Sequence, residues 1–135
     1  MPFSEKFISL HDSIDNITLL SHSIKSSVIL EKVQEIIIQL NLINEHKNIN
    51  YLKSYSFENY ITFEKIVDDY LIHVINHFLS IPDHLMKNKE NHFIEMTLKQ
   101  LQIIDNKLLS MIEIFSQNKL SEMNIFHKFL DEALK

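Results

Sequence analysis

Residues 93–115 read FIEMTLKQLQIIDNKLLSMIEIF, and apolar residues recur in this stretch at steps of three and four. Such spacing places one apolar stripe along an α-helix. The inward positions of this helix would be Ile94, Leu98, Leu101, Ile104, Leu108, Ile112 and Phe115. A helix with one apolar face has to bury that face against another element. The stretch therefore predicts a long amphipathic helix that packs against other helices.

The N-terminal third carries two more apolar stripes. Helical spacing from Phe3 to Val28 predicts a helix that begins near Ser4 as its N-cap. A new register runs from Leu30 to Ile43, and the change falls in the serine-rich segment 21–27, where helix propensity is low. We expect either one long helix that bends at this segment or two helices that separate there. Residues 45–55 have no helical period and predict a connection.

A second strong helix precedes residues 93–115. Ser56 is expected to cap it, and it should end near Ser80. Its inward side chains would be Phe57, Tyr60, Phe63, Val67, Tyr70, Leu71, Val74 and Phe78. The sequence Ser80-Ile81-Pro82-Asp83 then combines a serine cap with a proline in the first turn of another helix. The polar segment 87–91 predicts a break.

The last helix is expected to be separate from residues 93–115. Asn118 can adopt the left-handed conformation that ends a helix, and Ser121 can cap the next one. Its buried side chains would be Ile125, Phe126, Phe129, Leu130 and Leu134. We therefore expect residues 1–135 to form one all-α domain, an antiparallel bundle of four or five helices.

The absence of glycine supports an all-helical fold, and two further absences exclude kinds of site. The 135-residue chain contains no glycine, which is the residue that tight hairpins and phosphate-binding loops require at fixed positions. It also contains no arginine and no cysteine, so bidentate phosphate recognition by arginine, disulfides and thiolate metal sites are excluded. Abundant Ile, Asn and Lys without Arg indicate an AT-rich genome.

The charge and the hydropathy of the chain limit the kinds of partner that it can bind. Thirteen scattered lysines face eighteen carboxylates, and the net charge of −5 with no basic stripe argues against nucleic-acid binding. The sequence contains no run of eighteen apolar residues, so it predicts no membrane-spanning helix. The N-terminus has acidic residues and does not resemble a signal peptide. We expect a cytoplasmic protein, either of the producing cell or, for an effector, of a host.

His22 and Lys25 form the first candidate site. On a helix these residues, three apart, share a face, and an exposed imidazole beside a cation can accept a phosphoryl group. The segment Ser21-His22-Ser23-Ile24-Lys25-Ser26-Ser27 resembles the His-x-Leu-Lys-Gly motif of histidine-phosphotransfer proteins, with Ser26 in place of the glycine. The resemblance implies that His22 is the phosphoacceptor. The alternative is a surface histidine in a serine-rich bend.

Asp69, His73 and His77 form a second candidate, because steps of four place them on one helix face. Two histidines at this spacing can share a divalent metal, and His84 follows just after the turn. A polar helix flank is the alternative interpretation. Among the carboxylates, Asp105 lies between Leu101 and Leu108 and is expected to accept hydrogen bonds at the edge of the core.

Ile36, Ile37 and Ile38 cover most of a helical turn, so one helix side cannot bury all three. The helix is therefore either central in the bundle or part of a partner interface. No convergent catalytic set is present in the sequence, and we expect no enzyme activity and no cofactor. The expected function is a helical interaction module, of adaptor, immunity or effector type, that binds a protein partner or forms a homo-oligomer.

The C-terminal half carries a family resemblance. A helix runs into Phe78-Leu79-Ser80-Ile81-Pro82, a long helix contains Ile104-Asp105-Asn106-Lys107-Leu108-Leu109, and the chain approaches its end with Phe129-Leu130-Asp131-Glu132-Ala133-Leu134. This layout resembles the helical region of the 5-bromo-4-chloroindolyl phosphate hydrolysis proteins, which are neighbours of the toxic-anion-resistance family. The resemblance implies a helical partner-binding role in a stress system.

Overall fold

The computed structural model describes residues 9–135, and these residues form helices packed against one another without a strand. The helices are α1 (Leu10–Ser21), α2 (Ser27–Ile43), α3 (His46–Tyr55), α4 (Phe57–Lys65), α5 (Leu71–Leu79) and α6 (Asp83–Ala133), with a π-helical segment η2 (Ile66–Tyr70) between α4 and α5. Because α4, η2 and α5 form one continuous rod, the described chain has five helical rods. The predicted all-α bundle is confirmed. The predicted cap at Ser4 lies outside the described residues.

The serine-rich segment separates two helices rather than bending one. Ser9 caps α1 by accepting a hydrogen bond from the backbone N–H of Asp12 at 3.1 Å. Ser26 caps α2 by accepting one from the N–H of Ile29 at 3.4 Å. Residues 22–26 between the helices are not helical. The new helix also turns Val28 outward, although the N-terminal stripe predicted it to be inward.

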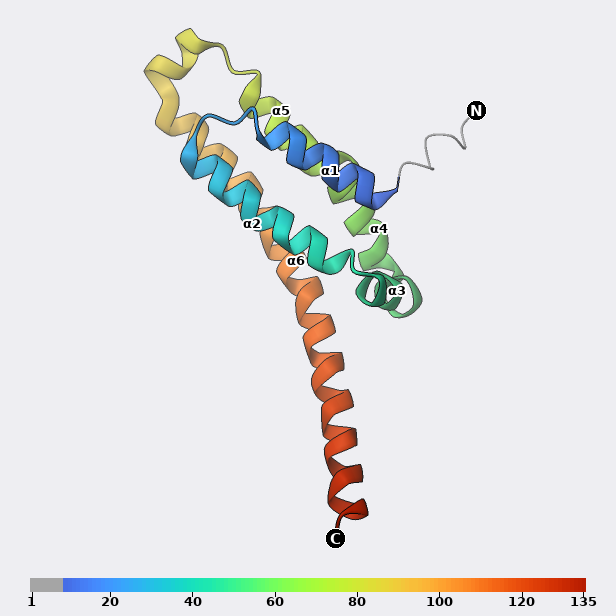
Figure 1. The fold of residues 1–135 in the computed structure, drawn as a ribbon. Helices are drawn as coiled ribbons and strands as arrows, with labels where there is room; N and C mark the ends of the chain where they lie inside the picture. The colour runs from blue at the N-terminus through green and yellow to red at the C-terminus, as the bar shows by residue number, and fades with distance from the viewer. Residues whose placement is uncertain (1–8) are drawn as a thin grey trace, which may run out of the picture.

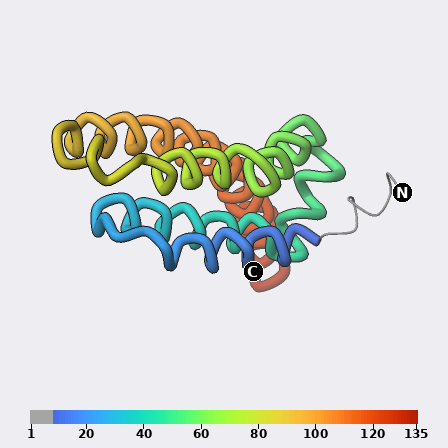
Figure 2. Tube along the Cα trace, turned by 90° about the horizontal axis from the view of Figure 1, so that it is seen from above, coloured from blue at the N-terminus to red at the C-terminus, as the bar shows by residue number. Residues whose placement is uncertain are grey.

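Four of the rods form a square bundle. Helix α1 packs on α2, α2 on the first half of α6, α6 on α5, and α5 together with η2 on α1. Figure 2 shows these four rods side by side in two layers. Figure 1 shows that α1 runs opposite to α2 and α5 opposite to α6, whereas α2 and α6 run in the same direction, as do α1 and α5. Helix α3 crosses one end of the bundle between α2 and α4 (Figure 1).

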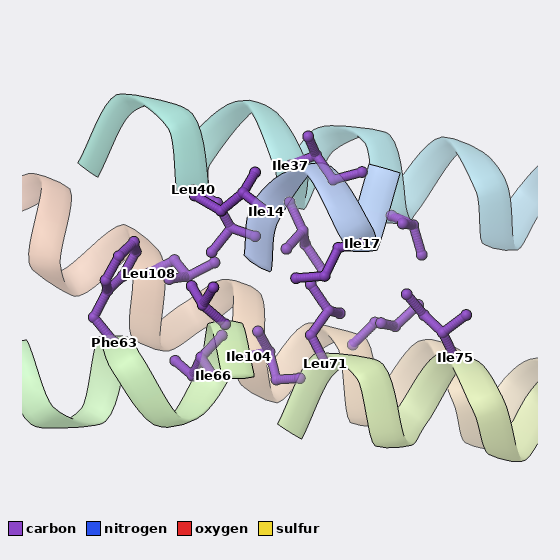
Figure 3. Close-up of a cluster of buried hydrophobic side chains, with 14 of the residues drawn as sticks. Ile14, Ile17, Ile37, Leu40, Phe63, Ile66, Leu71, Ile75, Ile104 and Leu108 are labelled. Atoms are coloured by element: carbon purple, nitrogen blue, oxygen red, sulfur yellow. The ribbon is translucent and has the colours of Figure 1, made fainter. Parts of the chain in front are cut away.

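The core fills the space between the four rods. Ile14 and Ile17 of α1 lie opposite Leu71 and Ile75 of α5, and Leu108 of α6 lies near Leu40 of α2 (Figure 3). These side chains are almost completely inaccessible to solvent. Burying one leucine or isoleucine stabilises the fold by about 1.5–3 kcal/mol, so this cluster accounts for most of the favourable free energy.

Helix α3 corrects the expectation that residues 45–55 form a connection. Leu52 is completely buried, Ile49 packs against the core, and Tyr51 stacks edge-on against Phe115 at 6.2 Å between ring centroids. The segment is short and its mean hydropathy is low, so its own sequence signal is weak. Contacts with α2 and α4 stabilise it as a helix.

The π-helical segment η2 explains one further difference. Its wider turn keeps side chains at three successive steps of four, from Phe63 to Ile75, on the core side, whereas a regular α-helix would rotate them away from it. As a consequence Tyr70, which the sequence predicted to be inward, is 46% exposed. Phe57, in the first turn of α4, is also exposed and stacks on Tyr60 at 5.8 Å.

Helix α6 is longer than expected. Pro82, not Ser80, occupies its N-cap, while Ser80 ends α5 and donates a hydrogen bond to the carbonyl of His77. The predicted break in residues 87–91 corresponds to a kink at Lys89, whose φ is −134°. The predicted ends at Asn118 and Ser121 are wrong, because the helix continues through both residues to Ala133. The second half of α6 therefore extends beyond the bundle (Figure 1).

Candidate functional site

The segment that contains His22 and Lys25 does not have the helical geometry that the sequence predicted. His22 caps the C-terminus of α1, and Lys25 lies in the non-helical link to α2, so the two do not share a helix face. Both side chains are exposed. Lys25 lines a hollow together with Asp83 and Glu90, whose negative charges disfavour a phosphoryl group at this place.

The predicted metal ligands come together only in part. Asp69 Oδ1 lies 3.2 Å from Nδ1 of His73, and the rings of His73 and His77 meet edge-on at 5.1 Å between centroids. These residues lie on the solvent side, and His84 is exposed in the first turn of α6. From Ser9 to Lys135, no three or more His, Asp or Glu side chains are arranged to hold a metal ion. The polar helix flank is the interpretation that this geometry supports.

The expected partner surface at Ile36, Ile37 and Ile38 is mostly internal. Ile36 is completely buried and Ile37 is 9% exposed, because α2 packs on α1 from one side and on α6 from the other. Ile38 is 69% exposed on the outer side of the helix, and Leu42, one turn further along, is 39% exposed. The prediction of a three-residue surface is therefore wrong, because the packing of α2 on two neighbours buries Ile36 and Ile37.

Asp105 is the hub of a buried polar network between α6 and α2. Its carboxylate accepts hydrogen bonds from Lys32 Nζ at 2.9 Å, Gln39 Nε2 at 2.6 Å and Gln102 Nε2 at 3.2 Å. Burial raises the pKa of Asp105, but these donors and the charge of Lys32 outweigh burial and hold the pKa below its ordinary value. The expected hydrogen-bonding role of Asp105 is confirmed. With its acceptors filled by side chains, the network is a link between helices and not an open site.

The largest departure from the sequence prediction is the C-terminal part of the chain, which we call the arm and define as residues 116–135. Every side chain from Lys119 onward is exposed. The exposed side chains include seven large apolar ones: Leu120, Met123, Ile125, Phe126, Phe129, Leu130 and Leu134. Monomeric proteins rarely expose a contiguous apolar surface of this size without a role in binding.

The arm is amphipathic. At about 100° per residue, its apolar side chains cover roughly 220° of the helix circumference, and Ser121, Asn124, Lys128 and Asp131 lie on the remaining sector. Phe126 and Phe129 stack on each other at 5.8 Å, with 19° between the ring planes. Three lysines and three carboxylates between residues 116 and 135 balance each other. The arm thus presents a broad apolar face with no excess of either charge.

A groove of about 420 Å³ lies where the arm leaves the bundle. Ile112 and Phe115 of α6 form one wall, and Leu42 of α2 and Tyr51 of α3 belong to the opposite side. Ser116 and polar residues on its rim make the groove open and only partly apolar. It continues directly onto the inner face of the arm, because Lys119 and Glu122 also line it.

Sequence reasoning found the apolar residues of the arm but assigned them to the core. Periodicity shows which side of a helix is apolar, whereas it cannot show what that side contacts. The groove was missed because residues 45–55 were expected to be a connection. The twenty residues after Phe115 contain no proline, and this was the available signal that α6 continues.

No family model, no curated protein and no solved structure matches this chain. The resemblance to the helical region of the phosphate-hydrolysis proteins therefore remains a prediction. No helix within residues 9–135 is both long enough and apolar enough to cross a membrane.

Proposed function

We propose that this protein is a non-enzymatic helical interaction module, of adaptor, immunity or effector type, and that the arm is its binding surface. The observation that carries the proposal is the set of seven large apolar side chains on the part of α6 that packs against no other helix within residues 9–135. An amphipathic helix that lacks a partner loses the stabilisation that packing normally supplies. Covering this face by another protein restores that stabilisation.

The bundle acts as the rigid support of the arm. Helix α6 is continuous from its kink at Lys89 to Ala133, so the buried half holds the exposed half in a fixed direction. The polar network at Asp105 and the neighbouring core residues Leu101 and Leu108 anchor this half. A rigid, preorganised helix loses less conformational entropy on binding than a segment that must first fold.

Affinity capture from the native host tests the proposal with three matched baits: the wild-type chain, Phe126→Lys and Asn124→Lys. Both substitutions add one positive charge to an exposed position of the arm, but Phe126 lies on the apolar side and Asn124 on the polar side. We expect the Asn124→Lys bait to retain the bound proteins and the Phe126→Lys bait to lose them. A captured set that is the same for all three baits would show that the arm is not the binding surface.

A further inference from the structure

The arm and the groove at its base are complementary surfaces that one chain cannot bring together. The groove has apolar walls on α6 and on α2 and α3, and it is open to solvent. The arm leaves the groove as a straight helix, and its tip lies far from the bundle (Figure 1). The tip carries Phe126, Phe129 and Leu130, which match the apolar walls in chemistry. A second chain can supply the tip that the first chain cannot fold back.

We propose that the partner of the arm is a second copy of this chain. The two α6 helices lie antiparallel about a two-fold axis near residue 121, and the tip of each arm lies in the groove of the other chain. This inference rests on the proposed function and names the partner. A two-fold interface uses the same patch on both chains, so each contact occurs twice.

The spacing of residues along α6 is self-complementary for this arrangement. Ile112, Ser116, Lys119, Met123, Phe126 and Leu130 follow one another at steps of 4, 3, 4, 3 and 4. This series reads the same in both directions, and helical geometry places it on one face. In an antiparallel pair, each residue therefore meets a residue of the same series.

The pairs are also matched in size. Ile112 of one chain lies opposite Leu130 of the other, and small Ser116 leaves room for Phe126. The aliphatic stem of Lys119 covers Met123 of the other chain. Its ammonium, which lies 3.5 Å from Glu122 of its own chain, is also close to the other chain's Glu122. Alternation of large and small side chains across a helix pair lets the two layers interdigitate.

The width of the apolar face of the arm fits a tip that lies in a groove better than a contact between two helices alone. Near the axis, where the two helices meet only each other, the apolar positions are Leu120 and Met123, flanked by Lys119 and Glu122. At the tip, Ile125 and Phe129 widen the face on one side of the stripe that contains Phe126 and Leu130, and Leu134 widens it on the other side. A tip held between two walls needs apolar side chains on both flanks.

Area and charge favour a second copy over a lipid surface. Seven exposed apolar side chains of this size supply on the order of 800 Å², which is about what each partner contributes to a stable interface. Helices that lie on membranes usually carry a surplus of lysine or arginine on their polar face. The arm has three lysines against three carboxylates and lacks this surplus.

Sedimentation equilibrium of the full chain, from low micromolar up to about 100 µM, tests the proposal. We expect the wild-type chain to sediment at twice its mass of 16.0 kDa. Phe126→Lys should weaken dimerisation on the order of 10³-fold, because an aromatic hot spot is lost at both symmetric positions. Ser116→Asp should also give a monomer by filling and charging the site that receives Phe126. The control Asn124→Lys should remain dimeric.

Mixing the two monomeric variants tests whether the tip of each arm lies in the groove of the other chain. The Phe126→Lys chain keeps a native groove, and the Ser116→Asp chain keeps a native tip. One exchange site in the mixed pair is therefore native, and at the other an introduced lysine faces an introduced aspartate. We expect the mixture to form a heterodimer at concentrations where each variant alone is monomeric. Circular dichroism should show unchanged helix content, because both substituted side chains are exposed.

The other outcomes overturn the inference in distinguishable ways. A monomeric wild-type chain that still captures a different protein through its arm removes the second copy as partner and leaves the proposed function intact. A monomeric chain that binds phosphatidylcholine–phosphatidylglycerol vesicles, and loses this binding with Phe126→Lys, removes both in favour of a lipid surface. A dimer that neither variant weakens removes both the exchange and the arm as the interface.

Discussion

The two halves of α6 have similar sequences and opposite environments. Between residues 97 and 111 one apolar side is packed against α2 and α5, where Leu101 and Leu108 are completely buried, and only Ile103 and Leu109 lie exposed on the other side. Between residues 120 and 134 the apolar side chains are just as frequent, yet Phe126 and Phe129 are 58% and 60% exposed. The helix is the same in both halves, so the difference shows that amphipathicity reports a need for a contact and not the contact itself.

The sharpest test of this comparison is one substitution made in both halves. Leu108→Ala should lower the free energy of unfolding by about 2–5 kcal/mol, because it leaves a cavity in the core. Leu130→Ala should change it by less than about 0.5 kcal/mol, because no packed cavity forms at an exposed site. Urea denaturation of both variants, each in the Phe126→Lys background so that association makes no contribution, provides the measurement. Equal losses would mean that the arm folds back onto its own bundle.

The second largest effect is expected at the polar network of the buried half. Asp105→Ala removes the acceptor of Lys32 and Gln39 and should destabilise the fold by about 3 kcal/mol. Asp131→Ala in the arm is the matched control and should fall within about 0.5 kcal/mol of the wild-type chain. The midpoint of urea unfolding at neutral pH reports both values. An Asp105→Ala chain as stable as the control would show that the network contributes specificity but not stability.

The loss of folding stability at low pH should also originate in the buried half of α6. Because the folded-state pKa of Asp105 is lowered, its contribution is complete above the unfolded-state pKa of about 4 and is lost as the pH falls through the folded-state value. We expect the urea concentration at the unfolding midpoint of the wild-type chain to decrease when the pH falls below about 4. The corresponding decrease should be smaller in Asp105→Asn, which cannot ionise there. Parallel pH profiles of the two chains would place the acid sensitivity elsewhere.

The smallest effect concerns the helix of the arm. Asn124→Gly lowers helix propensity by a few tenths of a kcal/mol and should leave the unfolding of the bundle unchanged. In the monomeric Phe126→Lys background, amide hydrogen exchange of residues 120–133 should be faster than that of residues 98–112, and Asn124→Gly should accelerate it further. Uniform protection along α6 would contradict the contrast between its halves.

Much of the core was predictable from periodicity. Most inward positions of α1, α2 and the first half of α6 are those that the apolar stripes predict, as Ile17, Val33 and Leu108 illustrate, whereas the buried Ile29 and Met111 lie outside the stripes. The hydrogen-bonding role of Asp105 also followed from its place between two core leucines. These predictions succeeded because a side chain at a stripe position has no other direction in which to point once the helix forms.

The sequence predictions that were wrong concern features that depend on contacts between segments that are distant in sequence. Residues 46–55 become helical because Leu52 finds a core to enter, and Tyr70 turns outward because a π-helical segment rotates the register. The three donors of Asp105 come from two helices, so their convergence has no local signal.

The sequence by itself determined that the chain is helical and which side of each helix is apolar, because both depend on local propensity and on the 3.6-residue period. The tertiary structure alone decided which apolar sides face one another. The four rods together cover the core of the bundle. Helix α6 continues beyond the part of the bundle where the other rods contact it. For this reason, the same pattern of leucine and phenylalanine forms a core near Leu108 and an exposed arm near Phe126.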